Sequence, residues 1–354
     1  MGEPVLVLRA LGLGDALTGV PALRGLRRLH PGRPLLLAAP RVIGEWLTDL
    51  GLVDGCVPTS GLDDEPPGLR VGPHDAVNLH GCGPQSHALL LAGGPRSLLA
   101  FTPADDGRVG DEVEAVAPGL PAWRSDEHEV LRWCRLVTSA GGPCSPEDLR
   151  LGPPFHLWRA SAANQARIPQ DHATHDGGAE GDGPAGGDGL ARGEARPYVM
   201  LHPGAASGSR RWPVDRWVHV VREVSRRADV RLTGSDDERA LCETVAERAG
   251  LAAASVTAGS LDLPSLLDLV AHAALLVCGD TGVAHVATAT GTPSVLLFGP
   301  VSPELWGPAI DTDRHTCLWH GDGTGDPHAD APDPALLRIT PAEVLAAADT
   351  LLGR

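Results

Sequence analysis

The sequence contains no lysine: all 29 basic residues in the 354-residue chain are arginines. Schiff-base catalysis and a Walker-type phosphate site both require a lysine, so both are excluded. The basic residues are also outnumbered by 45 acidic ones, which gives a formal net charge of -16. A general binder of nucleic acids or anionic membranes needs an excess of positive charge. We therefore expect a small or neutral partner and no nucleic acid.

Paired cysteines and long apolar runs are missing too. The seven cysteines stand at positions 56, 82, 134, 144, 242, 278 and 317, and no two of them form a Cys-x-x-Cys motif. An odd, unclustered set without a secretory leader is typical of reduced thiols in a cytoplasmic protein. No apolar run approaches the ~18 residues that a membrane-spanning helix needs. The sequence thus predicts a cytoplasmic protein with reduced cysteines.

The length and the hydrophobic pattern together predict two domains. A chain of 354 residues is longer than a single hydrophobic core usually supports. Helices separate most of the predicted strands, which lie at 4–9, 34–39, 75–80 and 97–101, then at 197–201, 229–233, 255–257, 274–277 and 292–300, the last closing its sheet. This alternation favours two Rossmann-like parallel α/β domains that face each other across a cleft.

The predicted domains are 1–160 and 197–354. The segment between them, 161–196, is rich in Gly, Asp and Ala without apolar periodicity, so we expect a flexible insertion or linker and assign it no chemistry. A final helix begins after Thr340 and is expected to pack back on the N-terminal domain.

A glycine-rich turn follows the first predicted strand and precedes one helix with apolar residues every three positions. Gly12 and Gly14 lie in this turn, but Leu17 occupies the place where a dinucleotide-binding fingerprint needs its third glycine. An NAD-type site is therefore not expected. Asp15 has two interpretations of equal weight: a helix N-cap, or a functional carboxylate at the carboxyl end of a strand.

A second strand-to-helix turn, at 278–285, is the best candidate for an anion site. It follows an apolar run that predicts a buried parallel strand, and it opens a helix that runs toward Gly291. Free backbone N–H groups and the positive end of the helix dipole meet at such a turn and suit a phosphate. Thr281 and His285 are four residues apart, so both side chains are expected on the face beside that point.

Two more polar residues follow predicted strands. His80 precedes Gly81 at a strand end, where it could face a cleft or could be an ordinary loop histidine. Asp236 lies in an acidic turn before a helix, and charge complementation of the helix dipole explains such a residue as well as a functional role does.

Four segments in this order resemble the heptosyltransferase-type glycosyltransferases of family nine, which have a two-domain GT-B fold. The segments are 8–23, 202–213, 232–236 and 279–300, and the resemblance covers residues 4 to about 308 apart from the insertion. It implies inverting, metal-independent transfer of a heptose-like sugar from a nucleotide diphosphate donor, with ADP as the nucleotide. The implied acceptor is a glycolipid, as in lipopolysaccharide-type biosynthesis. The all-Arg, Ala/Gly-rich composition points to GC-rich coding and leaves a cell-wall or natural-product acceptor equally open.

The resemblance also implies roles for individual residues. Asp15 matches the general base that takes the proton of the acceptor hydroxyl, and Gly14 and His80 are candidates for the acceptor side. Thr281 and Gly282 would hold the donor phosphates.

Four further residues are assigned to the donor. His285 would add a hydrogen-bond donor to the phosphates, whereas Asp280 would repel a diphosphate and is assigned to sugar hydroxyls or to fixing the loop. Asp236 matches a position near the ribose or the base. Arg210 replaces a lysine common in the family; it can neutralise phosphate but cannot transfer a proton, and Arg211 is its alternative.

Two other functions stay open on the sequence alone. One is a nucleotide-sugar epimerase or hydrolase on the same architecture, which would turn over the donor without an acceptor. The other is a non-catalytic nucleotide-sugar-binding protein, because Ala205 and Ala206 replace hydroxyl residues that often contact phosphate in relatives. We expect no cofactor besides the nucleotide-sugar substrate, no bound metal, a monomer, and peripheral contact with the inner face of the membrane.

Overall fold

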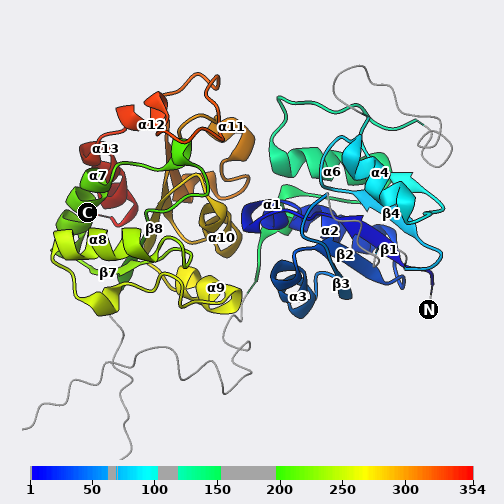
Figure 1. The fold of residues 1–354 in the computed structure, drawn as a ribbon, viewed down its shortest axis with the longest axis horizontal. Coiled ribbons are helices and arrows are strands. Elements are labelled where there is room, and N and C mark those ends of the chain that lie inside the picture. Colours follow the sequence, from blue (N-terminus) through cyan, green and yellow to red (C-terminus); the bar gives the residue numbers. More distant parts are fainter. Residues whose placement is uncertain (1, 63–68, 70, 103–118, 153–196, 354) are drawn as a thin grey trace, which may run out of the picture.

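The computed structural model describes residues 2–62, 69, 71–102, 119–152 and 197–353, and it places them in two α/β domains (Figure 1). The predicted linker at 161–196 lies outside the described residues. Each domain is built on a five-stranded sheet, and the strand pairs are parallel in both sheets. The predicted α/β class with two parallel sheets is therefore confirmed.

The N-terminal sheet has the strand order β3-β2-β1-β4-β5. Its strands are β1 (Val5–Leu8), β2 (Leu35–Ala39), β3 (Gly55–Pro58), β4 (Asp75–Asn78) and β5 (Leu98–Leu99). The helices of this domain are α1 (Leu13–Thr18), α2 (Val20–Leu29), α3 (Arg41–Asp49), α4 (Gln85–Ala92), α6 (Glu129–Ser139) and the 3-10 turn η2 (Pro146–Leu149).

The side chains of β1 are buried on both faces of this sheet. Val5 and Val7 belong to one core cluster, while Leu6 and Leu8 belong to another on the opposite face. A parallel sheet covered by helices on both sides requires such a continuous apolar run. The single helix predicted after β1 is instead two helices, because Pro21 lacks the N–H group that would continue the hydrogen bonding of α1.

The C-terminal sheet has the strand order β10-β9-β8-β6-β7. Its strands are β6 (Tyr198–His202), β7 (Asp229–Leu232), β8 (Leu275–Gly279), β9 (Ser294–Leu297) and β10 (His315–Leu318). The helices are α7 (Val214–Ser225), α8 (Arg239–Ala249), α9 (Leu263–Ala271), α10 (Gly282–Thr290), α11 (Pro303–Trp306), α12 (Pro334–Arg338) and α13 (Pro341–Leu351), with 3-10 turns η5 (Gly208–Arg210), η6 (Ala253–Ser255) and η7 (Thr312–Arg314).

Two sequence predictions about this sheet are wrong. The segment 292–300 does not close the sheet, because β10 pairs in parallel with β9 and forms the edge. The predicted strand at 255–257 is only an isolated bridge between Val256 and Leu232. Strand β10 and the segment 255–257 are both short and partly polar, so an apolar pattern alone does not predict their pairing.

The final helix packs on its own domain, which corrects the prediction that it returns to the N-terminal one. Helix α13 contacts α7 and strands β8, β9 and β10, as the red helix beside α7 in Figure 1 illustrates. Its buried residues Val344 and Ala348 belong to the same core cluster as Trp217 of α7. Only two residues separate α13 from α12, so the chain has no length to reach the other domain.

The prediction of seven reduced cysteines is wrong for one pair. Cys134 of α6 and Cys144 form a disulfide, with 5.2 Å between their Cα atoms, and the other five cysteines are free. The chain turns at Gly141, which has a positive φ, and brings Cys144 back beside the helix. Among the described residues, no helix is both long enough and apolar enough to cross a membrane.

Candidate functional site

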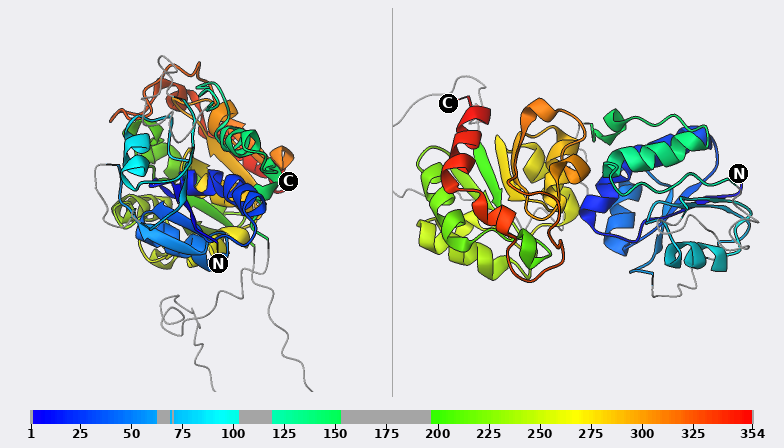
Figure 2. Two further views of the ribbon diagram at one scale, coloured as in Figure 1. Left: turned by 90° about the vertical axis from the view of Figure 1, so that its right-hand side faces the viewer. Right: turned by 90° about the horizontal axis from the view of Figure 1, so that it is seen from above.

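The carboxyl ends of β1 and β8 meet where the two domains touch. Helix α1 follows β1, helix α10 follows β8, and these two helices contact each other (Figure 1; Figure 2, right). The contact relies on glycine: a Cβ on Gly282 would lie 3.1 Å from the backbone N of Gly14. Ligands bind open parallel sheets at the carboxyl ends of the strands, so this contact marks the candidate site.

Asp15 lies in the first turn of α1, whose N-cap is Gly12, so the N-cap interpretation of Asp15 is wrong. Its side chain is 30% exposed, and its Oδ1 lies 3.9 Å from Nη2 of Arg9. Burial raises the pKa of Asp15, the positive charge of Arg9 opposes that rise, Glu129 adds to it, and Arg210 of the other domain opposes it more weakly. The carboxylate therefore lies within the field of the C-terminal domain.

Asp280 begins the turn between β8 and α10 and is 7% exposed. Nη1 of Arg210 lies 3.7 Å from its Oδ2 and 3.4 Å from its carbonyl oxygen. Burial raises the pKa of Asp280; Arg210 lowers it, and the negative charge of Asp15 raises it. Asp15, Asp280 and Arg210 thus form one charged cluster contributed by both domains.

Helix α10 begins at Gly282, with Thr281 as its N-cap residue. The hydroxyl of Thr281 makes no capping hydrogen bond, which leaves it available to a ligand. The first N–H groups of a helix have no intrahelical acceptor, and they lie at the positive end of the dipole. The helix N-terminus predicted within 278–285 is therefore present next to Asp280, and its binding of an anion stays a prediction.

His285 lies one turn into α10 and packs against the other domain. It is 7% exposed, its ring centroid is 6.1 Å from that of Trp306, and a Cβ on Gly14 would lie 2.9 Å from its Cδ2. Burial, with a smaller contribution from the nearby His128, lowers the pKa of His285 to about 4. At neutral pH the ring is uncharged, so it could offer a phosphate one N–H group but no positive charge.

His80 holds the turn that carries Asp15. Its Nδ1 accepts a hydrogen bond of 3.2 Å from the backbone N–H of Ala10. Burial lowers the pKa of His80 to about 4, with a further contribution from Arg9. The ring is therefore neutral, as an acceptor of this hydrogen bond must be.

The two adjacent arginines point in different directions. Arg210 ends the turn η5 and faces Asp280, as described above. Its Nε is buried and has no hydrogen-bond partner within the described residues. Arg211 is exposed, and its Nε donates a 2.8 Å hydrogen bond to the carbonyl of Ala205. The geometry thus favours Arg210 as the residue that faces a ligand.

Glu238, which the sequence analysis passed over, is placed better than Asp236. The Asp236 side chain is 83% exposed and lies 3.5 Å from Arg239. The Glu238 side chain is 14% exposed; its Oε2 accepts from the N–H of Ser235 at 2.7 Å and lies 3.7 Å from Nε2 of His202. It therefore occupies the space between the ends of β6 and β7. The Ser-x-x-Glu pattern of a capping box, here 235–238, was the signal that could have identified it.

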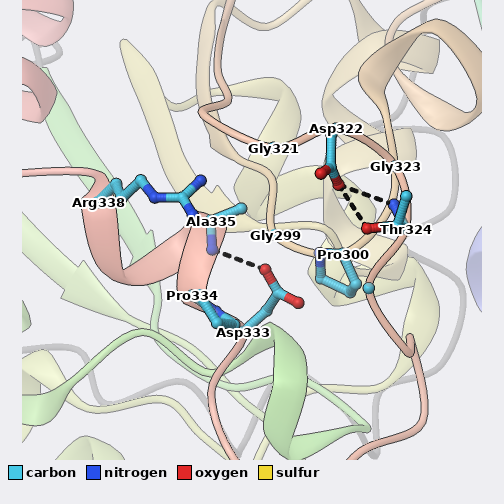
Figure 3. A pocket seen from close by; sticks show the side chains of 11 residues that line it. Gly299, Pro300, Gly321, Asp322, Gly323, Thr324, Asp333, Pro334, Ala335 and Arg338 are labelled. Atoms are coloured by element: carbon cyan, nitrogen blue, oxygen red, sulfur yellow. Dashed lines mark hydrogen bonds between the residues drawn. The ribbon is translucent and has the colours of Figure 1, made fainter.

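A cavity of about 190 Å³ lies elsewhere, between the loops that follow β9 and β10 and the start of α12 (Figure 3). Its carboxylates are engaged: Asp322 accepts from Thr324, and Asp333 accepts from the N–H of Ala335 at 2.7 Å. It contains none of the predicted site residues, and the N–H of Asp333 donates a hydrogen bond to the carbonyl of Ser209 in the η5 turn. The described part of the chain holds no group of three or more His, Cys, Asp or Glu residues that could bind a metal.

The family model for glycosyltransferase family 9 (heptosyltransferase) matches residues 121–329. Lipopolysaccharide heptosyltransferase 3 of Escherichia coli is 31% identical over 166 residues, which are 45% of this chain and 48% of that protein. The chain thus spans about half the length of the curated relatives it matches. Asp15 lies outside the range matched by the family model.

Solved structures show the same fold over nearly the whole chain. The E. coli ADP-heptose lipopolysaccharide heptosyltransferase II has a TM-score of 0.69 at 19% identity, covering 99% of this chain and 98% of that one. The family 9 glycosyltransferase of Veillonella parvula has a TM-score of 0.72 at 17% identity, covering 99% and 97%. The two facing parallel α/β domains are thus a GT-B fold. Because the family model also matches more than half of the sequence, the chain belongs to glycosyltransferase family 9, the heptosyltransferase family.

Proposed function

We propose that this protein transfers a heptose-like sugar from a nucleotide diphosphate donor to an acceptor hydroxyl, with inversion and without a metal. The observation that carries the proposal is the placement of Asp15 of one domain in the electrostatic field of Arg210 and Asp280 of the other. A transferase needs a base for the acceptor beside a site for the donor phosphates. This cluster supplies both groups.

Different residues at the carboxyl edge of the C-terminal sheet bind the diphosphate and the sugar of the donor. Thr281 and Gly282 hold the diphosphate at the start of α10, and Arg210 neutralises it from the η5 turn. His285 adds a neutral N–H donor. Asp280 binds sugar hydroxyls. A buried carboxyl group is stabilised when it is protonated or accepts hydrogen bonds from hydroxyls, whereas a buried carboxylate next to a phosphate would be repelled by it.

The nucleoside is assigned to Glu238 rather than Asp236. A half-buried carboxylate at a strand end can accept hydrogen bonds from ribose hydroxyls, whereas Asp236 points to solvent. Because the hydrogen bonds within the described residues use only one Glu238 oxygen, the other is available to a ligand.

The reaction is a single displacement at the anomeric carbon. The acceptor oxygen forms a bond to that carbon and gives its proton to Asp15, while the bond from the carbon to the phosphate oxygen breaks. The diphosphate leaves with the electron pair and is stabilised by the α10 N-terminus and Arg210. No acid is required at the leaving group, and Arg210 cannot act as one at ordinary pH.

ADP is the proposed nucleotide because a structural relative is described as an ADP-heptose lipopolysaccharide heptosyltransferase. The proposed acceptor is a cell-envelope glycolipid, with natural products as the second class, and the enzyme acts as a monomer at the inner membrane face. Thermal unfolding in the presence of equal concentrations of ADP, UDP, GDP and dTDP tests the donor, because a ligand that binds only the folded state stabilises it more the lower its Kd. We expect the largest shift with ADP; no shift with any of the four contradicts the proposal.

A hydrolase or epimerase on the same fold differs in one measurable property. A transferase releases ADP from an ADP-sugar at an appreciable rate only when an acceptor is present. Full turnover of the donor without an acceptor would assign the protein to the alternative class. Nucleotide binding with no turnover under any condition would instead assign it to the non-catalytic class.

Replacing Arg210 should weaken the donor site much more than replacing Arg211. For Arg210→Gln we expect the KM for the nucleotide sugar to rise about tenfold or more, as the loss of a charge-assisted hydrogen bond implies. Arg211→Gln should stay within about twofold, because the Arg211 side chain is exposed and bonded to a backbone carbonyl. Initial-rate kinetics on both variants measures the difference, and equal effects would contradict the assignment.

The neighbouring carboxylates provide a second matched pair. Glu238→Gln should weaken ADP binding by about 5- to 20-fold, because a charged acceptor for ribose hydroxyls is lost. Asp236→Asn should leave the Kd nearly unchanged, since its side chain is exposed. Isothermal titration with ADP separates the two, and a larger effect at Asp236 would return the nucleoside contact to that residue.

A further inference from the structure

The guanidinium of Arg9 is buried directly behind Asp15. Arg9 follows β1 and is 2% exposed. Its Nε donates to the carbonyl of Asp15, and its Nη1 donates to the carbonyl of Leu79. Its Nη2 donates to Oγ1 of Thr18 at 2.9 Å, and Thr18 in turn donates to the carbonyl of Asp15. Arg9 therefore anchors both ends of the short helix that carries the base.

Glu129, in the first turn of α6, supplies the counter-charge of Arg9. It is 4% exposed, and its Oε1 accepts from Nη2 of Arg9 at 3.1 Å and from Nε1 of Trp133 at 2.7 Å. Its Oε2 accepts from Nη1 of Arg132. Both oxygens are thus engaged, and the side chain has no other orientation that keeps these bonds.

Arg9 is shared between two carboxylates. Its Nη2 lies 3.1 Å from Glu129 but 3.9 Å from Oδ1 of Asp15, so the closer pair is the one with Glu129. Without the charge on Glu129, a buried Arg9 would have only Asp15 as a partner. The carboxylate of Asp15 would then turn toward Arg9 and become a weaker base.

We propose that Glu129 is a positioning residue, which holds Arg9 in a separate ion pair and so leaves the carboxylate of Asp15 free to face the acceptor. The proposal rests on the proposed function, because it assumes that Asp15 is the base. No sequence pattern links the two residues, which meet only through the packing of α6 against the start of the N-terminal domain.

The charges that face Asp15 determine the direction in which its pKa should shift when Glu129 is replaced. Arg9 on its own domain and Arg210 on the other lower the pKa of Asp15, whereas Glu129 raises it. Asp280 faces it with a negative charge, and His285 is neutral at the pH of the assay. Loss of the Glu129 charge should therefore lower the pKa of Asp15, and the acid limb of the rate profile should move to lower pH.

The test is the pH profile of sugar transfer for Glu129→Gln. We expect kcat to fall about tenfold, as is typical for misplacement of a general base, with little change in the KM of the donor. The acid limb should shift to lower pH. Arg135→Gln is the matched control, because Arg135 lies on the same helix but bonds Glu127, with 2.7 Å between Nη2 and Oε2. The control should keep the wild-type position of the acid limb. A Glu129→Gln profile whose acid limb also stays at the wild-type pH, with only a lower maximal rate, would overturn the proposal.

A second variant covers the case in which Glu129→Gln does not fold. Trp133→Phe keeps a smaller aromatic ring under Arg9 and both charges, but removes the N–H donor to Oε1 of Glu129. Without this donor, the negative charge of Glu129 acts more strongly on Asp15 and should raise the pKa of Asp15. The acid limb of the rate profile should therefore move to higher pH, opposite to the shift in Glu129→Gln. An unshifted limb in Trp133→Phe would contradict the proposal.

A direct titration separates this inference from the proposed function. Carbon-13 NMR of the Asp15 carboxyl reports its pKa whether or not the protein transfers sugar. If wild type shows no transfer, the proposed function fails, while a lower Asp15 pKa in Glu129→Gln still supports the Glu129 role. If wild type is active but neither the titration nor the rate profile moves, only the Glu129 role is refuted.

Discussion

Asp15→Asn is expected to lower the rate of sugar transfer by about 10²- to 10⁴-fold, the usual contribution of a general base. Asparagine has nearly the shape of aspartate but cannot take the proton of the acceptor hydroxyl. ADP affinity should not decrease, because the donor groups lie on the other domain and Arg210 loses a competing negative charge. Steady-state transfer and isothermal titration with ADP measure the two effects separately.

A suitable control acid lies on the same domain, far from the domain contact. Asp54 pairs with Arg27 and accepts from the N–H of Leu35, at the start of β2. Asp54→Asn should therefore leave the transfer rate within about twofold of wild type, as is usual for a surface ion pair. An Asp15→Asn protein that kept more than a tenth of wild-type kcat would remove Asp15 from the proposed mechanism.

Gly282→Ala and Gly14→Ala should each lower transfer by about 10- to 100-fold, because misplacing a reacting group by about 1 Å can cost 10²-fold. A Cβ on Gly282 would lie 3.1 Å from the backbone N of Gly14, and a Cβ on Gly14 would lie 2.9 Å from Cδ2 of His285. Each methyl group must separate α1 from α10 and move Asp15 away from the donor. ADP binding, which needs only the C-terminal domain, should change much less.

The two glycine variants should not be additive. Both separate the same contact, so the double variant should be hardly slower than the worse single one. Gly61→Ala is the control, because a Cβ there meets nothing within 4 Å. Two results would contradict this role of the glycines in the contact between α1 and α10. One is a double variant whose loss of rate is the product of the two single losses, and the other is an ADP affinity that falls as much as the rate.

The sequence predicted the two turns of the site because local patterns mark them. Each follows a buried apolar strand and contains glycines next to a helix, and such turns form at the carboxyl edge of a parallel sheet. Asp15 and Asp280 were therefore placed at strand ends from the sequence alone. That the two lie together needed the domain arrangement, which the structure supplies.

Other features depend on side-chain direction or on distant packing. The η5 turn aims Arg210 inward and Arg211 outward, and no periodicity reports such a difference between neighbours. The capping pattern turns Glu238 toward β6 while Asp236 stays exposed. Glu129 reaches Arg9 because α6 packs against α2, although α6 is far from both in the sequence. The directions of Arg210 and Arg211 and the position of Glu129 are tertiary effects, which local patterns do not encode, whereas the placement of Glu238 follows a local capping pattern.

We propose that the C-terminal side of the contact between the domains holds the donor diphosphate opposite Asp15, and a crystal structure with bound ADP tests this placement. We predict that the phosphates lie within hydrogen-bonding distance of the first N–H groups of α10 and of the Arg210 guanidinium, on the side facing Asp15. ADP bound in the cavity beside Gly299 and Arg338, away from α10, would contradict the claim.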